Sequence, residues 1–330
     1  MTETPQIPEE TLSSSVFTGQ NIIGTLVLAL IFCATTAFTW SYLSETTTPA
    51  LYAQTASAVV PVPSPSTDVF ADIQLQAQSA IVVDTTTGQT LFEHRADIQL
   101  PLASLTKVAL ALAASQVLEP DLVLTIPYDT APEGSFQRLG EGQRWKVRDV
   151  IDFTLAVSSN AGADILARAA DSFIQARYPT APDTDATLWR MNKLVRELNL
   201  SRTYFLNTTG LDESPTQAGA FGSARDVATL FAYAASSSPH IFSATTKESF
   251  KMKSIDGAQT SAINTDEALP AITGIVMGKT GYTDLAGGNL AVTFDEAGHR
   301  IVAVVLGSTM AGRFEDMKTL VALTKEALVQ

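Results

Sequence analysis

The sequence predicts an α+β fold, in which one antiparallel sheet of about five strands is flanked by helices and joined to a helical subdomain. Runs rich in β-branched residues stand near both ends of residues 68–330, and helical patterns fill the interval between them. Two strands near the start and three near the end would complete a single sheet from both ends of the chain. An uncharged run at 21–43 adds an N-terminal transmembrane helix.

The residues ahead of the folded domain divide into three parts. Residues 1–20 contain acidic but no basic side chains and are expected to form a short tail. Residues 21–43 are long enough to span a bilayer core. The missing basic region and the length of this run favour an uncleaved anchor over a signal peptide. Residues 44–67 are rich in Thr, Ala, Ser and Pro, which is typical of a flexible linker.

Composition excludes several classes of function. The net charge of -13 argues against nucleic-acid binding as a main function. Cys33 is the one cysteine, so the chain can form neither an internal disulfide nor a cysteine-based metal site. The three histidines (His94, His240 and His299) are scattered without the spacing of metal ligands. We therefore expect no metal centre.

The elements of the folded domain are expected in a simple order. Residues 79–94 form a hairpin, because two β-rich runs flank Thr-Thr-Gly. A helix starts at Pro101 and continues through a run that is apolar on nearly all sides, so it is buried. Further helices are expected at 147–154, after Asn160, and at 186–198, 224–235 and 313–329. Before the last helix, the runs GIVMGKTGYT, GNLAVTF and RIVAVVLGST predict an antiparallel meander.

The stretch PLASLTK at 101–107 places Ser104 and Lys107 three residues apart. On a helix the two side chains share one face, which brings an amine beside a hydroxyl. A serine hydroxyl needs a neighbouring base to become a nucleophile. A lysine can be that base only if burial and nearby positive charge lower its pKa. A Ser-x-x-Lys pair occurs by chance about once in a chain of this length, so the pair gains meaning only from other motifs.

Two further motifs accompany this pair. The tripeptide SSN at 158–160 stands at an expected junction of loop and helix, where a plain helix cap is the simpler interpretation. The tripeptide KTG at 279–281 lies on an expected strand, and it arises by chance in well under about a tenth of chains of this size. The three motifs in this order, on helix, loop and strand, make coincidence a poor explanation.

Together the motifs resemble the signature of the penicillin-recognising serine enzymes. Within that group the chain resembles the D-alanyl-D-alanine carboxypeptidase family of low-molecular-weight penicillin-binding proteins. The likeness covers roughly residues 70–325 and implies the β-lactamase/transpeptidase-like fold. One departure is Ala161, which follows Asn160 where the family commonly has aspartate. The closer likeness rests on SRTYFLNTTGL (201–211), SARDVATL (223–230), SAINTDEAL (261–269) and GKTGYTDLAGGNLA (278–291).

The resemblance implies a role for each motif residue. Ser104 would attack the carbonyl of a terminal D-Ala-D-Ala bond and form an acyl-enzyme, with Lys107 as the general base. A second ammonium group, on Lys279, would favour the neutral form of Lys107. Ser158 would relay the proton to the leaving amine, and Asn160 would hold the backbone amide of the substrate.

The same resemblance places the free carboxylate of the substrate on the third motif. Lys279 and Thr280, with Gly281 beside them, would bind this carboxylate in an otherwise acidic protein. Arg313, in TMAGRFED, matches a family arginine implicated in carboxylate recognition. The alternative interpretation of Arg313 is a solvated residue in the first turn of the last helix.

The remaining implications concern the oxyanion, cofactors and partners. The oxyanion would lie between the backbone N–H groups of Ser104 and Tyr282, and each such donor is worth about 10²–10³ in rate. No metal or organic cofactor is implied. The implied partners are peptidoglycan stem peptides that end in D-Ala-D-Ala, and β-lactam antibiotics as inhibitors.

Three alternative functions share some of these features. A class A β-lactamase would carry a Glu-x-x-Leu-Asn pattern, but Val195 stands four residues before Asn199 where that glutamate belongs. An endopeptidase of the same family, cutting peptide crosslinks, has the same motifs and stays open. A non-catalytic muropeptide-binding module would have no need to keep both Ser104 and Lys107.

The location of the catalytic domain is inferred from the expected chemistry, because too few basic residues flank the apolar run for the positive-inside rule to orient it. The first basic residue of the chain is Arg95. Cell-wall peptide lies outside the bacterial cytoplasmic membrane, so we expect the catalytic domain at 68–330 on the outer side. Residues 1–20 would then form a cytoplasmic tail of a protein that crosses the membrane once.

Overall fold

The fold is taken from a computed structural model, which describes residues 68–128 and 137–330. The expected tail, transmembrane segment and linker (1–20, 21–43 and 44–67) lie outside these residues. Within the described ranges, no helix combines the length and the apolar character needed to cross a membrane. The anchor at 21–43 therefore stays a prediction.

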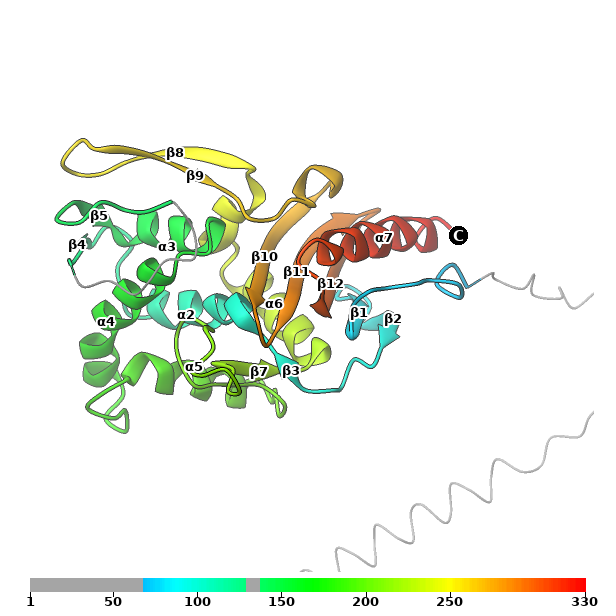
Figure 1. Ribbon diagram of the computed structural model, residues 1–330, viewed down its shortest axis with the longest axis horizontal. Helices are drawn as coiled ribbons and strands as arrows, with labels where there is room; N and C mark the ends of the chain where they lie inside the picture. Colours follow the sequence, from blue (N-terminus) through cyan, green and yellow to red (C-terminus); the bar gives the residue numbers. More distant parts are fainter. Residues whose placement is uncertain (1–67, 129–136) are drawn as a thin grey trace, which may run out of the picture. The chain divides into compact units, whose positions relative to one another are not determined.

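A five-stranded antiparallel sheet lies at the centre of the described chain, in the order β10-β11-β12-β1-β2. Its strands are β1 (Ser79–Asp84), β2 (Gln89–His94), β10 (Ile275–Thr283), β11 (Gly287–Glu296) and β12 (His299–Ser308). The first hairpin and the last meander are joined where β1 pairs with β12 (Figure 1). The prediction of one sheet built from both ends of the domain is confirmed.

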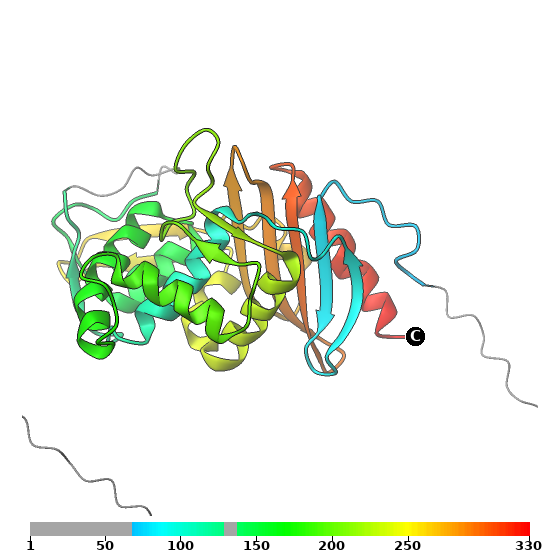
Figure 2. The ribbon, with the colours of Figure 1, turned by 90° about the horizontal axis from the view of Figure 1, so that it is seen from below.

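The helices predicted within residues 68–330 are all present and lie around this sheet. They are α2 (Thr106–Ser115), α3 (Val147–Ala156), α4 (Asn160–Arg177), α5 (Ala186–Glu197), α6 (Ala224–Ser237) and α7 (Gly312–Ala327), with 3₁₀ turns η1 (Ala103–Leu105), η2 (Pro239–Thr246) and η3 (Leu269–Ala271). Helices α2 to α5 form a helical region beyond β10, while α7 runs along the sheet (Figures 1 and 2). Helix α2 is buried along nearly its whole length, as its apolar pattern predicts.

The inner strands of the sheet are apolar and covered on both faces, and successive side chains of each strand point to opposite sides. On β12, Ile301 and Val305 belong to the cluster that contains the apolar side of α7. Val302 and Val304, which alternate with them, belong to the larger cluster that contains α2 and α6. The continuous apolar run of β12 therefore reflects a strand buried on both faces.

The start of the nucleophile helix differs from the prediction. Pro101, expected as the first helical residue, ends the short strand β3 (Leu100–Pro101), which pairs with β7 (Ala220–Gly222). The chain first turns helical at Ala103. The fixed φ of proline suits a short strand as well as a first helical turn, so the sequence does not separate the two.

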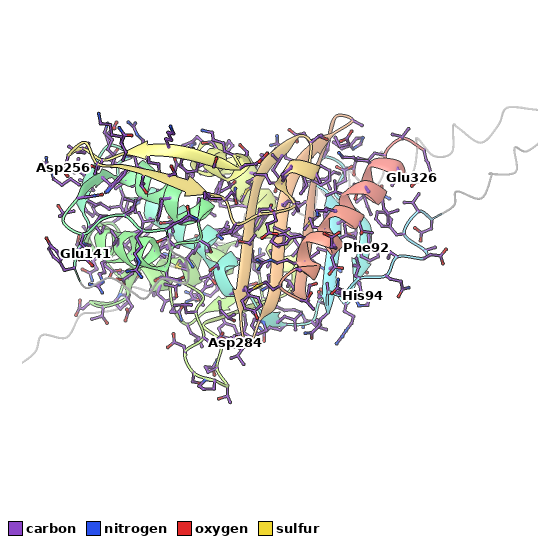
Figure 3. All side chains as sticks on the ribbon, turned by 45° about the horizontal axis from the view of Figure 1, so that its top comes forward. Phe92, His94, Glu141, Asp256, Asp284 and Glu326 are labelled. Atoms are coloured by element: carbon purple, nitrogen blue, oxygen red, sulfur yellow. The ribbon has the colours of Figure 1, made fainter. Side chains whose placement is uncertain are left out.

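The sequence pattern does not predict the hairpin of β8 (Ser249–Lys253) and β9 (Gln259–Ile263). Most of its side chains are exposed and each strand buries one residue, Met252 or Ala262, so its apolar alternation is weak. Its tip reaches the helical region, where Asp256 forms an ion pair of 2.7 Å with Arg144 (Figure 3). Arg144 belongs to a small ribbon of β4 (Val123–Thr125) and β5 (Arg144–Lys146).

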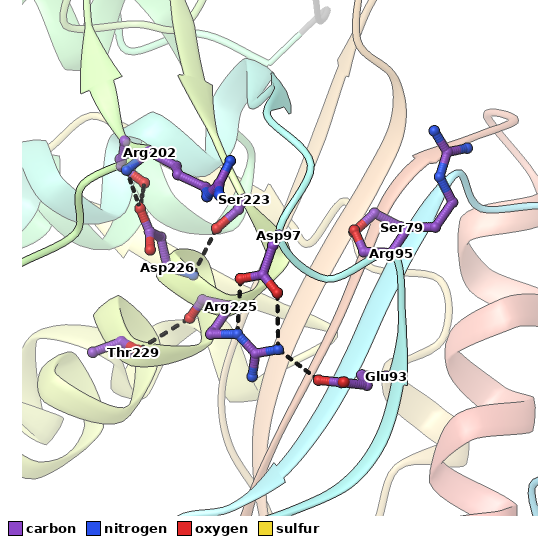
Figure 4. A network of polar contacts seen from close by, with 10 residues as sticks. Ser79, Glu93, Arg95, Asp97, Arg202, Ser223, Arg225, Asp226 and Thr229 are labelled. Atoms are coloured by element: carbon purple, nitrogen blue, oxygen red, sulfur yellow. Dashed lines mark hydrogen bonds and ion pairs between the residues drawn. The ribbon is translucent and has the colours of Figure 1, made fainter.

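A polar network fixes the segment that leads from β2 to the nucleophile (Figure 4). The guanidinium of Arg225, in the first turn of α6, donates to Asp97 at 2.9 Å and to Glu93 at 2.5 Å. The backbone N–H of the same residue donates to the carbonyl of Ala96 at 3.1 Å. Exposed ion pairs contribute only about 0–1 kcal/mol each, so this network matters mainly for where it holds the chain before Ser104.

Candidate active site

Ser104 and Lys107 stand at the start of α2, with Ser104 in η1 and Lys107 one turn later. The preceding residue, Ala103, has a φ of +48°, a strained conformation that the surrounding packing must hold. Lys107 is 0% exposed, whereas Ser104 is partly exposed. Lys107 Nζ lies 2.7 Å from Ser104 Oγ, as their spacing predicts.

Two further oxygen atoms hold the amine of Lys107. It donates to Asn160 Oδ1 at 2.8 Å and to the backbone carbonyl of Thr209 at 2.8 Å. A buried amine without polar partners would cost several kcal/mol, and these oxygen atoms offset that cost. They also keep Nζ within hydrogen-bond distance of Ser104 Oγ, which is the geometry that proton transfer requires.

The second motif enters the site from the start of α4. Ser158 has a φ of +62° in the loop before the helix, and the side chain of Ser159 accepts a backbone N–H one turn into the helix. The helix N-cap expected at this motif is therefore provided by Ser159, its middle residue. Ser158 and Asn160 are left to contact Lys279 and Lys107, respectively.

Lys279, on β10, is 2% exposed and donates to Ser158 Oγ at 2.8 Å. Burial lowers the pKa of Lys279 well below its ordinary value, the charges of Lys107 and Arg313 lower it further, and Asp266 acts in the opposite direction. Repulsion between two ammonium groups is mutual, so a charge on Lys279 also opposes a charge on Lys107. The two lysines are therefore electrostatically coupled.

Gly281 lets β10 approach the nucleophile closely. A Cβ atom at this position would lie 2.9 Å from the carbonyl oxygen of Leu102 and 3.2 Å from the backbone nitrogen of Ser104. The carbonyl of Gly281 accepts a hydrogen bond of 2.7 Å from Arg313 Nη1. Tyr282 follows on the strand with its side chain 42% exposed. The edge of β10 thus lies directly against the segment that carries Ser104.

Thr280 and Arg313 complete the cationic side of the site. Thr280 is buried and its hydroxyl lies 2.5 Å from that of Thr265. Arg313 is 8% exposed, and its guanidinium lies 4.6 Å from the ring centroid of Phe314. The interpretation of Arg313 as a solvated residue is therefore wrong. Burial lowers the pKa of Arg313, while the neighbouring charge of Asp266 raises it.

Hydrogen bonds join all three predicted motifs into one cluster. The Lys107–Asn160 bond links the first to the second, and the Ser158–Lys279 bond links the second to the third. Within the described parts of the chain, no group of three or more His, Cys, Asp or Glu side chains is placed to hold a metal ion. The predicted residues that the structure brings together are Ser104, Lys107, Ser158, Asn160, Lys279, Thr280, Gly281 and Arg313, and Tyr282 follows Gly281 on β10.

Sequence reasoning missed Thr209, whose carbonyl holds Lys107. The turn that presents this carbonyl is built by Asn207, whose Oδ1 accepts the N–H groups of Thr209 at 3.1 Å and Gly210 at 2.7 Å. Gly210 has a φ of +80°, and a Cβ atom there would lie 1.9 Å from the carbonyl oxygen of Ala103. The signal available in the sequence was Asn-Thr-Thr-Gly, which is typical of a side-chain-stabilised turn ending in glycine.

Asn289 is a second residue that the sequence did not single out. It is 0% exposed, donates to the carbonyl of Pro101 at 3.0 Å and accepts the N–H of Gly307 at 2.8 Å. These bonds tie the segment ahead of the nucleophile to β11 and β12. A buried amide with both ends satisfied fixes that register strongly, because losing either partner leaves a polar group unpaired.

Comparison with known proteins agrees with this geometry. A family profile described as D-alanyl-D-alanine carboxypeptidase matches residues 64–310. The chain is 30% identical over 261 residues to the carboxypeptidase DacA of Escherichia coli (strain K12), covering 75% of this chain and 60% of DacA. It is 30% identical over 231 residues to DacB2 of Mycobacterium tuberculosis, covering 70% and 74%.

A solved structure shares the fold. Penicillin-binding protein D2 of Listeria monocytogenes, in its cefotaxime-bound form, matches with a TM-score of 0.64 and 26% identity over 76% of this chain and 98% of that one. The present chain spans about 60% of the length of DacA, the curated relative named first. Its sheet and helices form a penicillin-binding, transpeptidase-like fold. On the family match over most of its length, the chain belongs to the D-alanyl-D-alanine carboxypeptidase family.

Proposed function

We propose that this chain is a serine-type D-alanyl-D-alanine carboxypeptidase that removes the terminal D-Ala from peptidoglycan stem peptides. The observation that carries the proposal is the distance of 2.7 Å between Ser104 Oγ and the fully buried Nζ of Lys107. Membership of the family supports the substrate class. The cefotaxime-bound form of the Listeria relative supports β-lactams as ligands of this chain.

Acylation begins with proton transfer from Ser104 to Lys107. The neutral amine accepts the hydroxyl proton while Ser104 Oγ forms a bond to the carbonyl carbon of the D-Ala-D-Ala peptide bond. The carbonyl oxygen gains negative charge and is stabilised by the backbone N–H groups of Ser104 and Tyr282. A donor of this kind is worth about 10²–10³ in rate. The close approach at Gly281 brings these two segments together.

The leaving amine needs a proton as the C–N bond breaks. Ser158 relays it from Lys107 to the departing D-Ala nitrogen, and the remaining peptide stays as an ester on Ser104. A water molecule then attacks the ester carbon, with Lys107 accepting its proton and returning it to Ser104 Oγ. The products are free D-Ala and the shortened stem peptide, and the enzyme is restored.

Substrate binding uses the rest of the cluster. Lys279, Thr280 and Arg313 bind the terminal carboxylate, which explains how an acidic protein takes an anionic substrate. Asn160, whose Oδ1 accepts a hydrogen bond from Lys107 Nζ, holds the backbone amide of the substrate. No step requires a metal or an organic cofactor.

The test uses the full-length protein in detergent with a pentapeptide ending in D-Ala-D-Ala. We expect release of one D-Ala per peptide and covalent labelling by a fluorescent penicillin. Ser104→Ala should lose both. Ser115→Ala is the matched control, because Ser115 lies at the far end of the same helix, where its hydroxyl donates to the carbonyl of Leu112. It should retain both activities.

The alternatives give other outcomes in the same assay. An endopeptidase would cut a crosslinked dimer and release no D-Ala from the pentapeptide. A β-lactamase would turn over a cephalosporin rapidly instead of staying acylated. A binding module would bind muropeptide without labelling of Ser104. Any of these results would overturn the carboxypeptidase proposal.

Residues 21–43 are proposed as the membrane anchor, with the catalytic domain outside the bacterial cytoplasmic membrane. The uncharged run and the extracellular substrate class support this arrangement. Protease added to intact spheroplasts should digest residues 68–330. Protection of this domain, or its recovery in the soluble fraction after lysis, would contradict the proposal.

A further inference from the structure

Asp266 is a buried acid beside the cationic end of the site. It lies between β9 and η3, is 5% exposed, and accepts the N–H of Ala268 at Oδ1 with a distance of 2.9 Å. Its other carboxyl oxygen, Oδ2, is buried without a hydrogen-bond partner among the described residues. A Cβ atom at Gly278 would lie 3.3 Å from Oδ2, so glycine at this position leaves room for the carboxyl group against β10.

The backbone around Asp266 is fixed to the catalytic strand. The neighbouring Thr265 contacts the hydroxyl of Thr280 at 2.5 Å, and its N–H donates to the carbonyl of Ala156 at 3.1 Å. The N–H of Asp266 itself is bound by Asn264 Oδ1 at 3.0 Å. The carboxyl group is therefore held beneath the strand that carries the third motif.

The charges that face Asp266 are mainly positive. Burial raises the pKa of Asp266 to about 6, while the charges of Arg313, on α7, and Lys279, on β10, act to lower it. Arg313 Nε is itself buried without a hydrogen-bond partner among the described residues. Glu267, on the same segment, is exposed and acts on Arg313. Lys107 faces Lys279 from α2 and opposes its charge.

We propose that Asp266 is a positioning residue that keeps Lys279 charged, beside the permanently charged Arg313, for the terminal carboxylate of the substrate. This inference rests on the proposed function. Two buried cations beside a third amine repel one another, and one buried carboxylate compensates part of that repulsion. Without it Lys279 loses its proton at a lower pH, and the anionic substrate loses a charged partner. Asp266 touches no reacting atom and acts through the two cations.

The test measures kcat and KM for the D-Ala-D-Ala peptide between pH 5 and pH 10, using the full-length wild type and Asp266→Asn. In Asp266→Asn we expect the alkaline limb of the kcat/KM profile to shift to lower pH by about 0.5–1 unit. At a fixed pH on that limb, kcat/KM should therefore fall by about 3- to 10-fold. The loss should appear mainly in KM. A purely structural role would instead lower kcat/KM in parallel at all pH values, and that result or an unchanged profile would overturn the proposal.

Two further variants separate the explanations. Glu267→Gln is the matched control, since this neighbouring acid is exposed, and its alkaline limb should coincide with that of the wild type. An equal shift in Glu267→Gln would mean a general field effect and would contradict the role of Asp266. Gly278→Ala keeps the carboxyl group but crowds it away from β10, so it should shift the limb in the same direction even if Asp266→Asn does not fold.

A second readout distinguishes this inference from the proposed function. The rate of acylation by a fluorescent penicillin, which also carries a carboxylate, should show the same alkaline shift in Asp266→Asn. If the wild type released no D-Ala, the proposed function would fail while the acylation profile still tested Asp266. If the wild type released D-Ala and both profiles of Asp266→Asn matched it, the inference alone would fail.

Discussion

Lys279 Nζ lies 2.8 Å from Ser158 Oγ, although 121 residues separate the two in the chain. The contact joins β10 to the loop before α4 and so connects the sheet to the helical region. Ser158 is held there with a φ of +62°, which costs about 1–3 kcal/mol for a residue with a side chain. Such strain persists only where the surrounding structure holds it, as at the junction of two catalytic motifs.

Removing the hydroxyl of Ser158 should block proton relay without unfolding the protein. We expect Ser158→Ala and Ser158→Gly both to lower kcat by about 10²–10⁴-fold, the usual contribution of a positioned proton-transfer group. Glycine relaxes the strained φ and alanine does not, so the two variants should differ in thermal stability but share the loss of activity. Activity retained in Ser158→Gly would show that backbone geometry, and not the hydroxyl, is what the site needs.

Gly210 and Gly88 form a matched pair for testing the turn that holds Lys107. Both have a φ of +80°, but a Cβ atom at Gly88 meets nothing within 4 Å, whereas at Gly210 it would lie 1.9 Å from the carbonyl oxygen of Ala103. Gly88→Ala should cost about 1 kcal/mol from backbone strain alone. Gly210→Ala should cost about 3 kcal/mol or more and displace the carbonyl of Thr209 from Lys107.

Urea unfolding measures the stability of both glycine variants, and D-Ala release measures their function. Gly88→Ala should keep full activity, because the β1–β2 turn that contains it is not part of the cluster around Ser104. Gly210→Ala should lose at least about tenfold in kcat. A misplaced Lys107 that raises the activation free energy by about 1.4 kcal/mol already has that effect. Equal destabilisation of the two variants would exclude steric contact with Ala103 as the cause.

The meeting of the three motifs was predictable because each carries its own side-chain pattern. Ser104 and Lys107 share a helical face by spacing alone, and KTG lies on a strand of the meander that the runs and turn lengths near the end of the chain predict. The third partner of Lys107 could not be found in this way, since the carbonyl of Thr209 is a backbone atom that any residue would supply. The position of this carbonyl depends on the turn that Asn207 stabilises. The turn is local, but its placement beside α2 is decided only by the tertiary fold.

Other features escaped prediction for different physical reasons. Pro101 is compatible with both a short strand and a helix start, and its pairing with β7 decides between them. The exposed hairpin of β8 and β9 has little apolar alternation to reveal it. Asp266 looks like an ordinary loop acid in the sequence, because its burial arises from packing against Gly278, which is outside its own segment.

Arg313 should contribute to substrate binding more than to the chemical step. Its guanidinium is buried and donates to the carbonyl of Gly281 at 2.7 Å, which places positive charge beside the third motif. We expect Arg313→Gln to raise KM for the D-Ala-D-Ala peptide about tenfold with a smaller effect on kcat, as loss of one charge-assisted hydrogen bond to a carboxylate would. Arg300→Gln, an exposed arginine paired with Asp295, is the control and should leave KM unchanged. A fall in kcat at constant KM would contradict this role.

Asp152, on α3, should make the stability of the domain depend on pH. Burial, with a smaller contribution from the charge of Asp149, raises the pKa of Asp152 from 3.8 to about 6. The folded state therefore binds this proton more tightly than the unfolded state does. Between about pH 4 and pH 6 the free energy of unfolding should fall as the pH rises, because ionisation is unfavourable only in the folded protein.

Replacing Asp152 with asparagine should remove that loss. Above pH 6 we expect Asp152→Asn to be more stable than the wild type by on the order of 1–3 kcal/mol, whereas near pH 4 the two should converge, since the carboxyl group is then protonated in the folded state. Thermal or urea unfolding at pH 4, 5, 6 and 7 measures the difference. Glu141→Gln, at an exposed acid of the helical region (Figure 3), should show no such trend. A stability difference for Asp152→Asn that stays constant across this range would mean that the carboxyl group does not titrate there, and that packing, not charge, decides its effect.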